Sequence, residues 1–197
     1  MPESNPPGPN TGFTPLQRIL HWVVAALVLA TLAGGLTIGR LGFDRVTAVL
    51  GGPGRDVLYE YHKTFGLIVL GLMLIRLFVR IDRGRPAYDP PLKPWQQGIS
   101  LTVHYLFYVL LIAMPVLGWL ATDMSDYPVE FFAWDFPQVV PKSETVGTLL
   151  YDWHRYVGWA IALLIVMHVG AGLMHWLVLR DGVMGRIALP MRPKSRR

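Results

Sequence analysis

Histidines are the residues whose type and spacing point most directly to chemistry in this chain. The stretch 151–180, YDWHRYVGWAIALLIVMHVGAGLMHWLVLR, carries His154 and His168 fourteen positions apart. In an α-helix that spacing puts both imidazoles within roughly 40° of one face and about 21 Å apart along the axis. One lone histidine in such a helix would more often be a structural hydrogen-bonding group. Two at this spacing suit two stacked metal cofactors, provided that other helices supply partners.

The helix that would position these histidines is one of four apolar segments long enough to cross a bilayer. Hydrophobic residues make up 52% of the chain and charged residues only 16%, which is typical of a membrane domain. The predicted membrane helices are 14–38, 57–80, 95–122 and 151–180.

Lys and Arg residues set the expected orientation of these helices. They are more numerous in the connections on the side where both chain ends fall, so the positive-inside rule puts both termini in the cytoplasm. The sequence therefore predicts an all-α integral membrane four-helix bundle of up-down topology over 14–180. Residues 1–13 are predicted to be a disordered extension, 123–150 an aromatic outer loop and 181–197 a basic cytoplasmic tail. We attribute the net charge of +5 to the basic residues that set this membrane orientation, and not to nucleic-acid binding.

The predicted topology pairs the histidines by depth. His62 should lie near the outer face with His154, and His21 near the cytoplasmic face with His168. Each pair joins two helices at one level, as in bundles that hold haem between two imidazoles. The sequence has no cysteine, which excludes thiolate ligation and covalent attachment. We therefore expect two non-covalent b-type haems.

Two further histidines, His104 and His175, fall toward the cytoplasmic side, and either could replace an inner ligand. His175 follows His168 by seven residues, on the same helical face and about 10 Å closer to the cytoplasm. That depth fits a quinone head group or a proton relay, and it fits interfacial snorkelling beside Trp176 equally well. His104 is expected to hydrogen-bond a neighbouring helix or a haem propionate.

Three basic residues could act on the predicted haems. Lys63 and Arg155 directly follow the outer histidines, where they could pair with haem propionates or attract an anionic electron donor. Propionate pairing is favoured, because the third loop is acidic overall. Arg76, near the end of the second predicted helix, needs a partner in the membrane and is a further candidate for a propionate.

The segments around these residues carry a family pattern. They read RILHW at His21, YHKTFG at His62, RLFVR from Arg76, HYLFYVLLIAMPVLGWL in the third helix and WHRYVGWAIALLIVMHVGAGLMHW in the fourth. These motifs resemble the bacterial cytochrome b561 family, over nearly the whole chain from about residue 14 to residue 193. Superoxide oxidase is a member of that family, and the cytochrome b subunits of hydrogenase and formate dehydrogenase are similar.

The resemblance implies that His21, His62, His154 and His168 bind two b haems. Gln17 and His175 match positions in the inner region that superoxide oxidase associates with ubiquinone, and the loop FFAWDFPQVVP resembles the superoxide oxidase type. The implied activity is that of a superoxide:ubiquinone oxidoreductase in the bacterial inner membrane, which passes single electrons from an outer donor to membrane quinone. The alternative is a non-catalytic subunit that passes electrons between a periplasmic dehydrogenase or cytochrome and quinone.

Overall fold

The computed structural model describes residues 12–88, 91–125, 127–132 and 134–189. Its main elements are α1 (Pro15–Arg83), α2 (Pro94–Met124) and α3 (Glu144–Leu173), and α3 continues as a π-helical segment at Met174–Leu179. A short hairpin, β1 (Val129–Phe131) and β2 (Trp134–Phe136), and a 3-10 turn at Met184–Arg186 complete the described part. Three helices, Pro15–Arg83, Pro94–Met124 and Glu144–Leu179, are long and apolar enough to cross a membrane. The predicted all-α class is confirmed.

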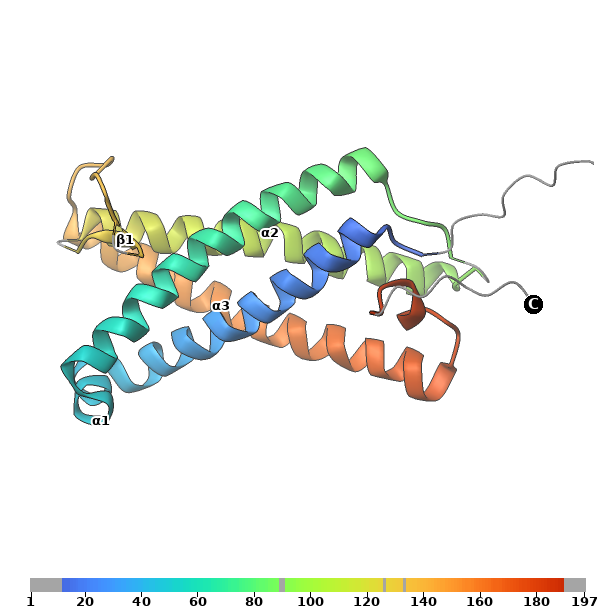
Figure 1. Cartoon of the computed structure of the whole chain (residues 1–197), viewed down its shortest axis with the longest axis horizontal. Coiled ribbons are helices and arrows are strands. Elements are labelled where there is room, and N and C mark those ends of the chain that lie inside the picture. The colour runs from blue at the N-terminus through green and yellow to red at the C-terminus, as the bar shows by residue number, and fades with distance from the viewer. Residues whose placement is uncertain (1–11, 89–90, 126, 133, 190–197) are drawn as a thin grey trace, which may run out of the picture.

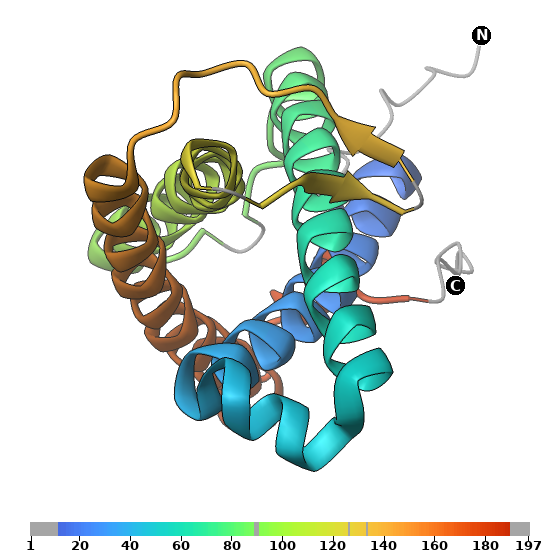
Figure 2. The ribbon, with the colours of Figure 1, turned by 90° about the vertical axis from the view of Figure 1, so that its left-hand side faces the viewer.

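Helix α1 folds back on itself and forms two arms (Figures 1 and 2). Its helical geometry is interrupted at Gly42 (φ 71°) and Gly51 (φ 72°), a backbone region that glycine enters at little cost. Pro53 follows in the first turn after the second break, where proline is tolerated. The connection between the first two predicted membrane helices, 39–56, is therefore broken at two glycines and is helical between them. We call residues 15–41 the first arm and residues 52–83 the second arm.

Helix α3 begins seven residues earlier than the sequence predicts. The Ser143 side chain accepts a hydrogen bond from the Val146 backbone N–H and caps the first turn, and Glu144 adds a favourable negative charge there. The first two turns of α3 therefore come from the predicted outer loop.

The buried core lies midway along the bundle. Val24 and Val28 of the first arm, Val69 and Met73 of the second arm, Leu111 of α2 and Ile161 of α3 form one cluster. Ile161 is seven residues from both His154 and His168, so the core lies between the two levels of histidine. Large apolar side chains also point outward, with Phe78 71% and Val166 69% exposed, as expected for helices solvated by lipid.

Contacts between the helices are unevenly distributed. Helix α2 packs extensively along α3, and α1 packs along α2, whereas α1 and α3 meet directly at few places. Helices α1 and α3 are thus neighbours with few direct contacts. The histidine pairs described below come from these two helices and face each other across the space between them.

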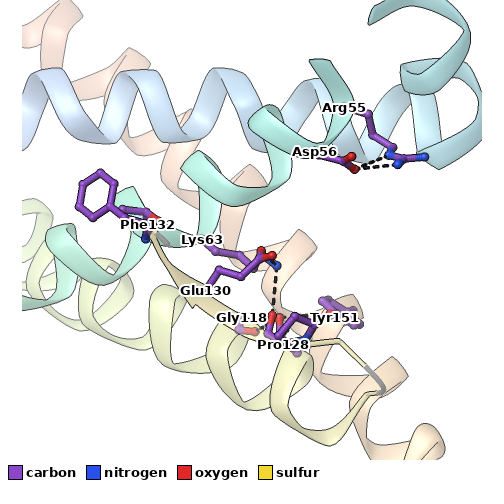
Figure 3. Close-up of polar contacts among 10 residues, drawn as sticks. Arg55, Asp56, Lys63, Gly118, Pro128, Glu130, Phe132 and Tyr151 are labelled. Carbon is purple, nitrogen blue, oxygen red and sulfur yellow. Dashed lines mark hydrogen bonds and ion pairs between the residues drawn. The ribbon is translucent and has the colours of Figure 1, made fainter. Parts of the chain in front are cut away.

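The β1–β2 hairpin is tied to the second arm of α1 (Figure 3). The Phe132 backbone N–H donates to Oγ1 of the buried Thr64 at 2.9 Å, and Lys63 forms an ion pair with Glu130. Behind the hairpin, the Asp123 carboxylate accepts hydrogen bonds from two backbone N–H groups, at residues 139 and 140. The aromatic segment predicted as an outer loop is therefore an anchored hairpin.

The two ends of the described chain meet at the opposite end of the bundle. Phe13 donates its backbone N–H to the Arg186 carbonyl at 3.1 Å, and Arg186 donates to the carbonyls of Pro86 and Ala87. Residues 12 and 189 therefore lie on the same side of the bundle. Most of the predicted N-terminal extension, 1–11, and the end of the predicted basic tail, 190–197, fall outside the described residues.

Candidate functional site

One histidine pair lies toward the hairpin end of the bundle, and we call it the outer pair. His62 of the second arm and His154 of α3 face each other with ring centres 6.1 Å apart. The Nδ1 atoms lie 3.1 Å from the Thr31 carbonyl oxygen and 3.0 Å from the Met114 carbonyl oxygen, respectively. A carbonyl only accepts, so each Nδ1 carries the proton and donates it. Each Nε2 is therefore left with a free lone pair, as in metal-binding histidines.

Two glycines of neighbouring helices give these rings their space. A Cβ built on Gly35 of the first arm would lie 2.8 Å from His62 Cε1, and one built on Gly118 of α2 would lie 2.9 Å from His154 Cε1. Contacts this short do not occur between packed side chains. Each outer imidazole therefore occupies a recess that any residue except glycine would fill, and the recess fixes the position of the ring.

Three of the other four histidines form an inner group, and each comes from a different helix. His168 of α3 has its ring centre 6.2 Å from that of His21 on the first arm and 5.4 Å from that of His104 on α2. Phe107 packs edge-on against His168 at 5.3 Å. The predicted partner of His168 is therefore beside it, and His104 is a second neighbour.

The two neighbours of His168 differ in their hydrogen bonds. His21 Nδ1 lies 3.0 Å from Nη2 of Arg76, which can only donate, so the ring accepts there and its own proton is on Nε2. His104 Nδ1 lies 2.5 Å from the Ser100 carbonyl oxygen and donates to it. Arg76 thus reaches the inner group, at the level where the sequence predicted a propionate partner.

The spacing of the pairs fits haem. A metal–nitrogen bond of about 2 Å, plus about 1 Å from that nitrogen to the ring centre, puts two axial imidazole centres about 6 Å apart. The separations of 6.1 Å and 6.2 Å match this value, and 5.4 Å is short of it. One turn from His62, a Cβ on Gly66 would meet nothing within 4 Å. Among the described residues no three His, Cys, Asp or Glu side chains are grouped as ligands for a bare metal ion.

Membrane-length helices that hold facing imidazole pairs at two levels define a membrane-bound cytochrome of the b type. The chain belongs to the prokaryotic cytochrome b561 family, whose sequence model matches residues 12–188. The family resemblance predicted from the motifs is confirmed. Members of this family bind b-type haem and transfer electrons in membranes.

Curated relatives cover the chain almost from end to end. It is 28% identical to "Cytochrome b561 homolog 1" of Escherichia coli K12, over 91% of this chain and 98% of the relative. It is 30% identical to "Cytochrome b562" of Cereibacter sphaeroides, over 93% and 97% of the two chains. It is also 24% identical to "Probable superoxide oxidase CybB" of Yersinia pestis, over 92% and 96%.

The predicted outer cations both have carboxylate partners. Lys63 pairs with Glu130 and donates to the Pro128 carbonyl at 3.1 Å (Figure 3). Arg155 pairs with Asp152 at 2.9 Å on the exposed side of α3. Their charges are thus partly balanced by neighbours, which favours short-range roles over attraction from a distance.

The two residues predicted to frame a quinone do not line a common pocket among the described residues. Gln17 accepts from the Thr14 backbone N–H in a capping box and donates to the Gly84 carbonyl at 3.0 Å. His175 borders a pocket of about 200 Å³ whose lining does not include Gln17. Nδ1 of His175 lies 2.5 Å from an Asp181 carboxylate oxygen.

Sequence reasoning missed several residues that shape these sites. Gly35 and Gly118 carry no sequence signal, because many glycines of membrane helices serve ordinary packing. The carbonyl acceptors at Thr31 and Met114 are backbone groups, which no pattern of side chains reveals. Asp181 could have been found, as the first acidic residue after the helix that carries His175.

Proposed function

We propose that the chain is a dihaem electron-transfer protein, with His62 and His154 holding an outer b haem and His21 and His168 holding an inner one. The observation that carries this proposal is the pair of imidazole separations near 6 Å, each between α1 and α3. With the two arms of α1 counted separately, the bundle has four membrane-spanning segments and both termini in the cytoplasm of a bacterial cell. The meeting of the two chain ends supports this topology.

His21 is preferred to His104 as the inner ligand because its distance from His168 suits two axial bonds. Iron binding through Nε2 would require His21 to carry its proton on Nδ1, so Arg76 would have to give up its present contact. The guanidinium would then be available to a haem propionate, which is the role predicted for Arg76. His104 would keep its hydrogen bond to the Ser100 carbonyl in its own helix.

The direction of electron flow that we propose is from an outer donor to membrane quinone. Superoxide is the favoured donor, supported by the similarity to the probable superoxide oxidase of Yersinia pestis. The haems, when bound, supply one-electron carriers at two levels. The protein fixes their imidazole ligands, and its apolar core between the two levels excludes water. Ubiquinone would accept the electrons at the cytoplasmic end, in the pocket beside His175.

The purified protein in detergent should oxidise superoxide without a partner. Given a superoxide source and a ubiquinone analogue, its haems should be reduced faster than spontaneous dismutation allows, and quinol should form. Stopped-flow absorption spectroscopy of the haem bands measures the first step, and quinol absorbance measures the second. Protein that is reduced only after a periplasmic dehydrogenase or cytochrome is added would be the non-catalytic subunit instead.

Lys63→Met and Arg155→Met should each slow superoxide-driven haem reduction by about two- to fivefold at low salt, because removing a cation near the outer haem weakens the local attraction for an anion. At about 1 M salt, where the Debye length is about 3 Å, both variants should match the parent rate. The matched control is Arg83→Met, which removes an exposed, ion-paired cation at the other end of the bundle. Unchanged rates at low salt would exclude attraction and leave propionate pairing.

A further inference from the structure

The end of the last membrane helix has an irregular backbone next to a polar pair. After α3, residues 174–179 adopt π-helical geometry, and Arg180 follows in a left-handed conformation at φ 50°. Gly182 is also left-handed, at φ 78°. π-helical turns and left-handed residues other than glycine concentrate at functional sites. Here they fold the chain back, so that Asp181 lies against the helix it has just left.

Asp181 is held from two sides. One carboxylate oxygen lies 2.5 Å from His175 Nδ1, and the other accepts a hydrogen bond from the Val183 backbone N–H at 3.2 Å. The side chains of His175 and Asp181 are 13% and 22% exposed, respectively, so both are largely shielded. A carboxylate oxygen accepts a hydrogen bond, so His175 Nδ1 carries a proton and donates it, which leaves Nε2 to exchange a proton with a ligand.

The ring of His175 borders a pocket that could receive such a ligand. The pocket, of about 200 Å³, is lined by His175, Trp176, Arg180, Gly182, Met184 and Gly185. It combines an aromatic ring and a methionine with one guanidinium. This lining suits a flat, partly apolar molecule with carbonyl oxygens.

We propose that Asp181 positions His175 as the proton donor to a quinone bound in this pocket, an inference that rests on the proposed function. The reaction is quinone plus two electrons and two protons giving quinol. The reduced cytochrome supplies the electrons one at a time, and an O–H bond forms at each quinone oxygen. His175 takes up a proton at Nε2 from cytoplasmic water and gives it to the quinone oxygen that it contacts, while the Asp181 carboxylate balances its charge. The other quinone oxygen takes its proton from water. Arg180 is the other charged residue that lines the pocket.

The test compares Asp181→Asn with Asp82→Asn. Asparagine keeps the size of the side chain and one acceptor oxygen but removes the charge. Asp82 is an exposed aspartate that pairs with Arg83 and does not line the pocket. In Asp181→Asn, haem reduction by the outer donor should match the parent. Haem reoxidation by a ubiquinone analogue should slow by at least about tenfold, with a larger effect of D₂O and with recovery on adding formate or acetate. Asp82→Asn should change none of these.

Two further measurements keep the proposal testable if that variant accumulates poorly. His175→Gln should slow reoxidation as much as Asp181→Asn, and the double variant should be no slower, because the two residues act as one unit. In ¹⁵N-histidine NMR spectra, the parent should show His175 with its proton on Nδ1 in a strong hydrogen bond. Asp181→Ala should show a mixture of tautomers.

Three results would overturn the inference. Parent-rate reoxidation in Asp181→Asn with haem content intact would make the pair a structural cap of the helix. Additive slowing in the double variant would show that His175 and Asp181 act independently of each other. A parent protein that quinone does not reoxidise at all would remove the proposed function and, with it, this role for Asp181.

Discussion

The His154→Ala protein should bind about one haem per chain instead of about two, and the His168→Ala protein should show the same loss at the other level. Each substitution removes one axial ligand, and the facing imidazole alone holds haem weakly. Pyridine haemochrome titration against protein concentration measures the stoichiometry. Redox titration should show one midpoint potential missing, and it should be a different one in each variant.

His104 provides the matched control for this experiment. It lies in the inner group at 5.4 Å from His168, but its bond to the Ser100 carbonyl stays within its own helix. His104→Ala should therefore keep both haems, and His21→Ala should lose the inner one. The reverse result, with haem lost from His104→Ala and kept in His21→Ala, would make His104 the inner ligand.

Gly118→Ala should lose most of the outer haem although the substitution removes no ligand. The added methyl would lie 2.9 Å from His154 Cε1, so the ring must leave the recess that aligns Nε2. Overpacking of this kind costs about 1–3 kcal/mol, which corresponds to about 5- to 150-fold in retention of a haem that needs this ring. Haem content and the spectrum of the remaining haem measure the effect.

Gly98→Ala is the control for that prediction. Gly98 lies in the same helix, and an added Cβ there would meet nothing within 4 Å. It tests for any general effect of replacing glycine by alanine in α2, and both haems should be kept. Full haem content in Gly118→Ala would mean that His154 can shift without losing iron, and the recess would then not control the outer site.

The broad design of the fold could be predicted because it follows from periodicity and hydropathy. The fourteen-residue spacing of His154 and His168 predicts one helical face. The alternating directions of the predicted helices place His62 at the depth of His154 and His21 at the depth of His168. The structure brings these partners to ring separations of 6.1 Å and 6.2 Å. These relations are regular and local, so sequence alone contains them.

The details of each site could not be predicted, because they depend on which backbone atoms of another helix face a given ring. Gly35 and Gly118 matter only because His62 and His154 happen to press against them. The turn that brings Asp181 back to His175 depends on a π-helical segment and on left-handed Arg180, which is not a glycine. These backbone conformations depend on how the segments pack against each other, and the amino-acid composition does not reveal them.

The sparse contact between α1 and α3 has a consequence for how the protein is made. The chain is made from its N-terminus, so His154 and His168 are made after His21 and His62, and neither histidine pair exists until α3 has been inserted. A haem held by these pairs would therefore be added after α3 has been made, and it would then link α1 to α3. In a cell short of haem, α1 and α3 of newly made chains would be held together only by their few direct contacts. Such chains would be exposed to membrane proteases.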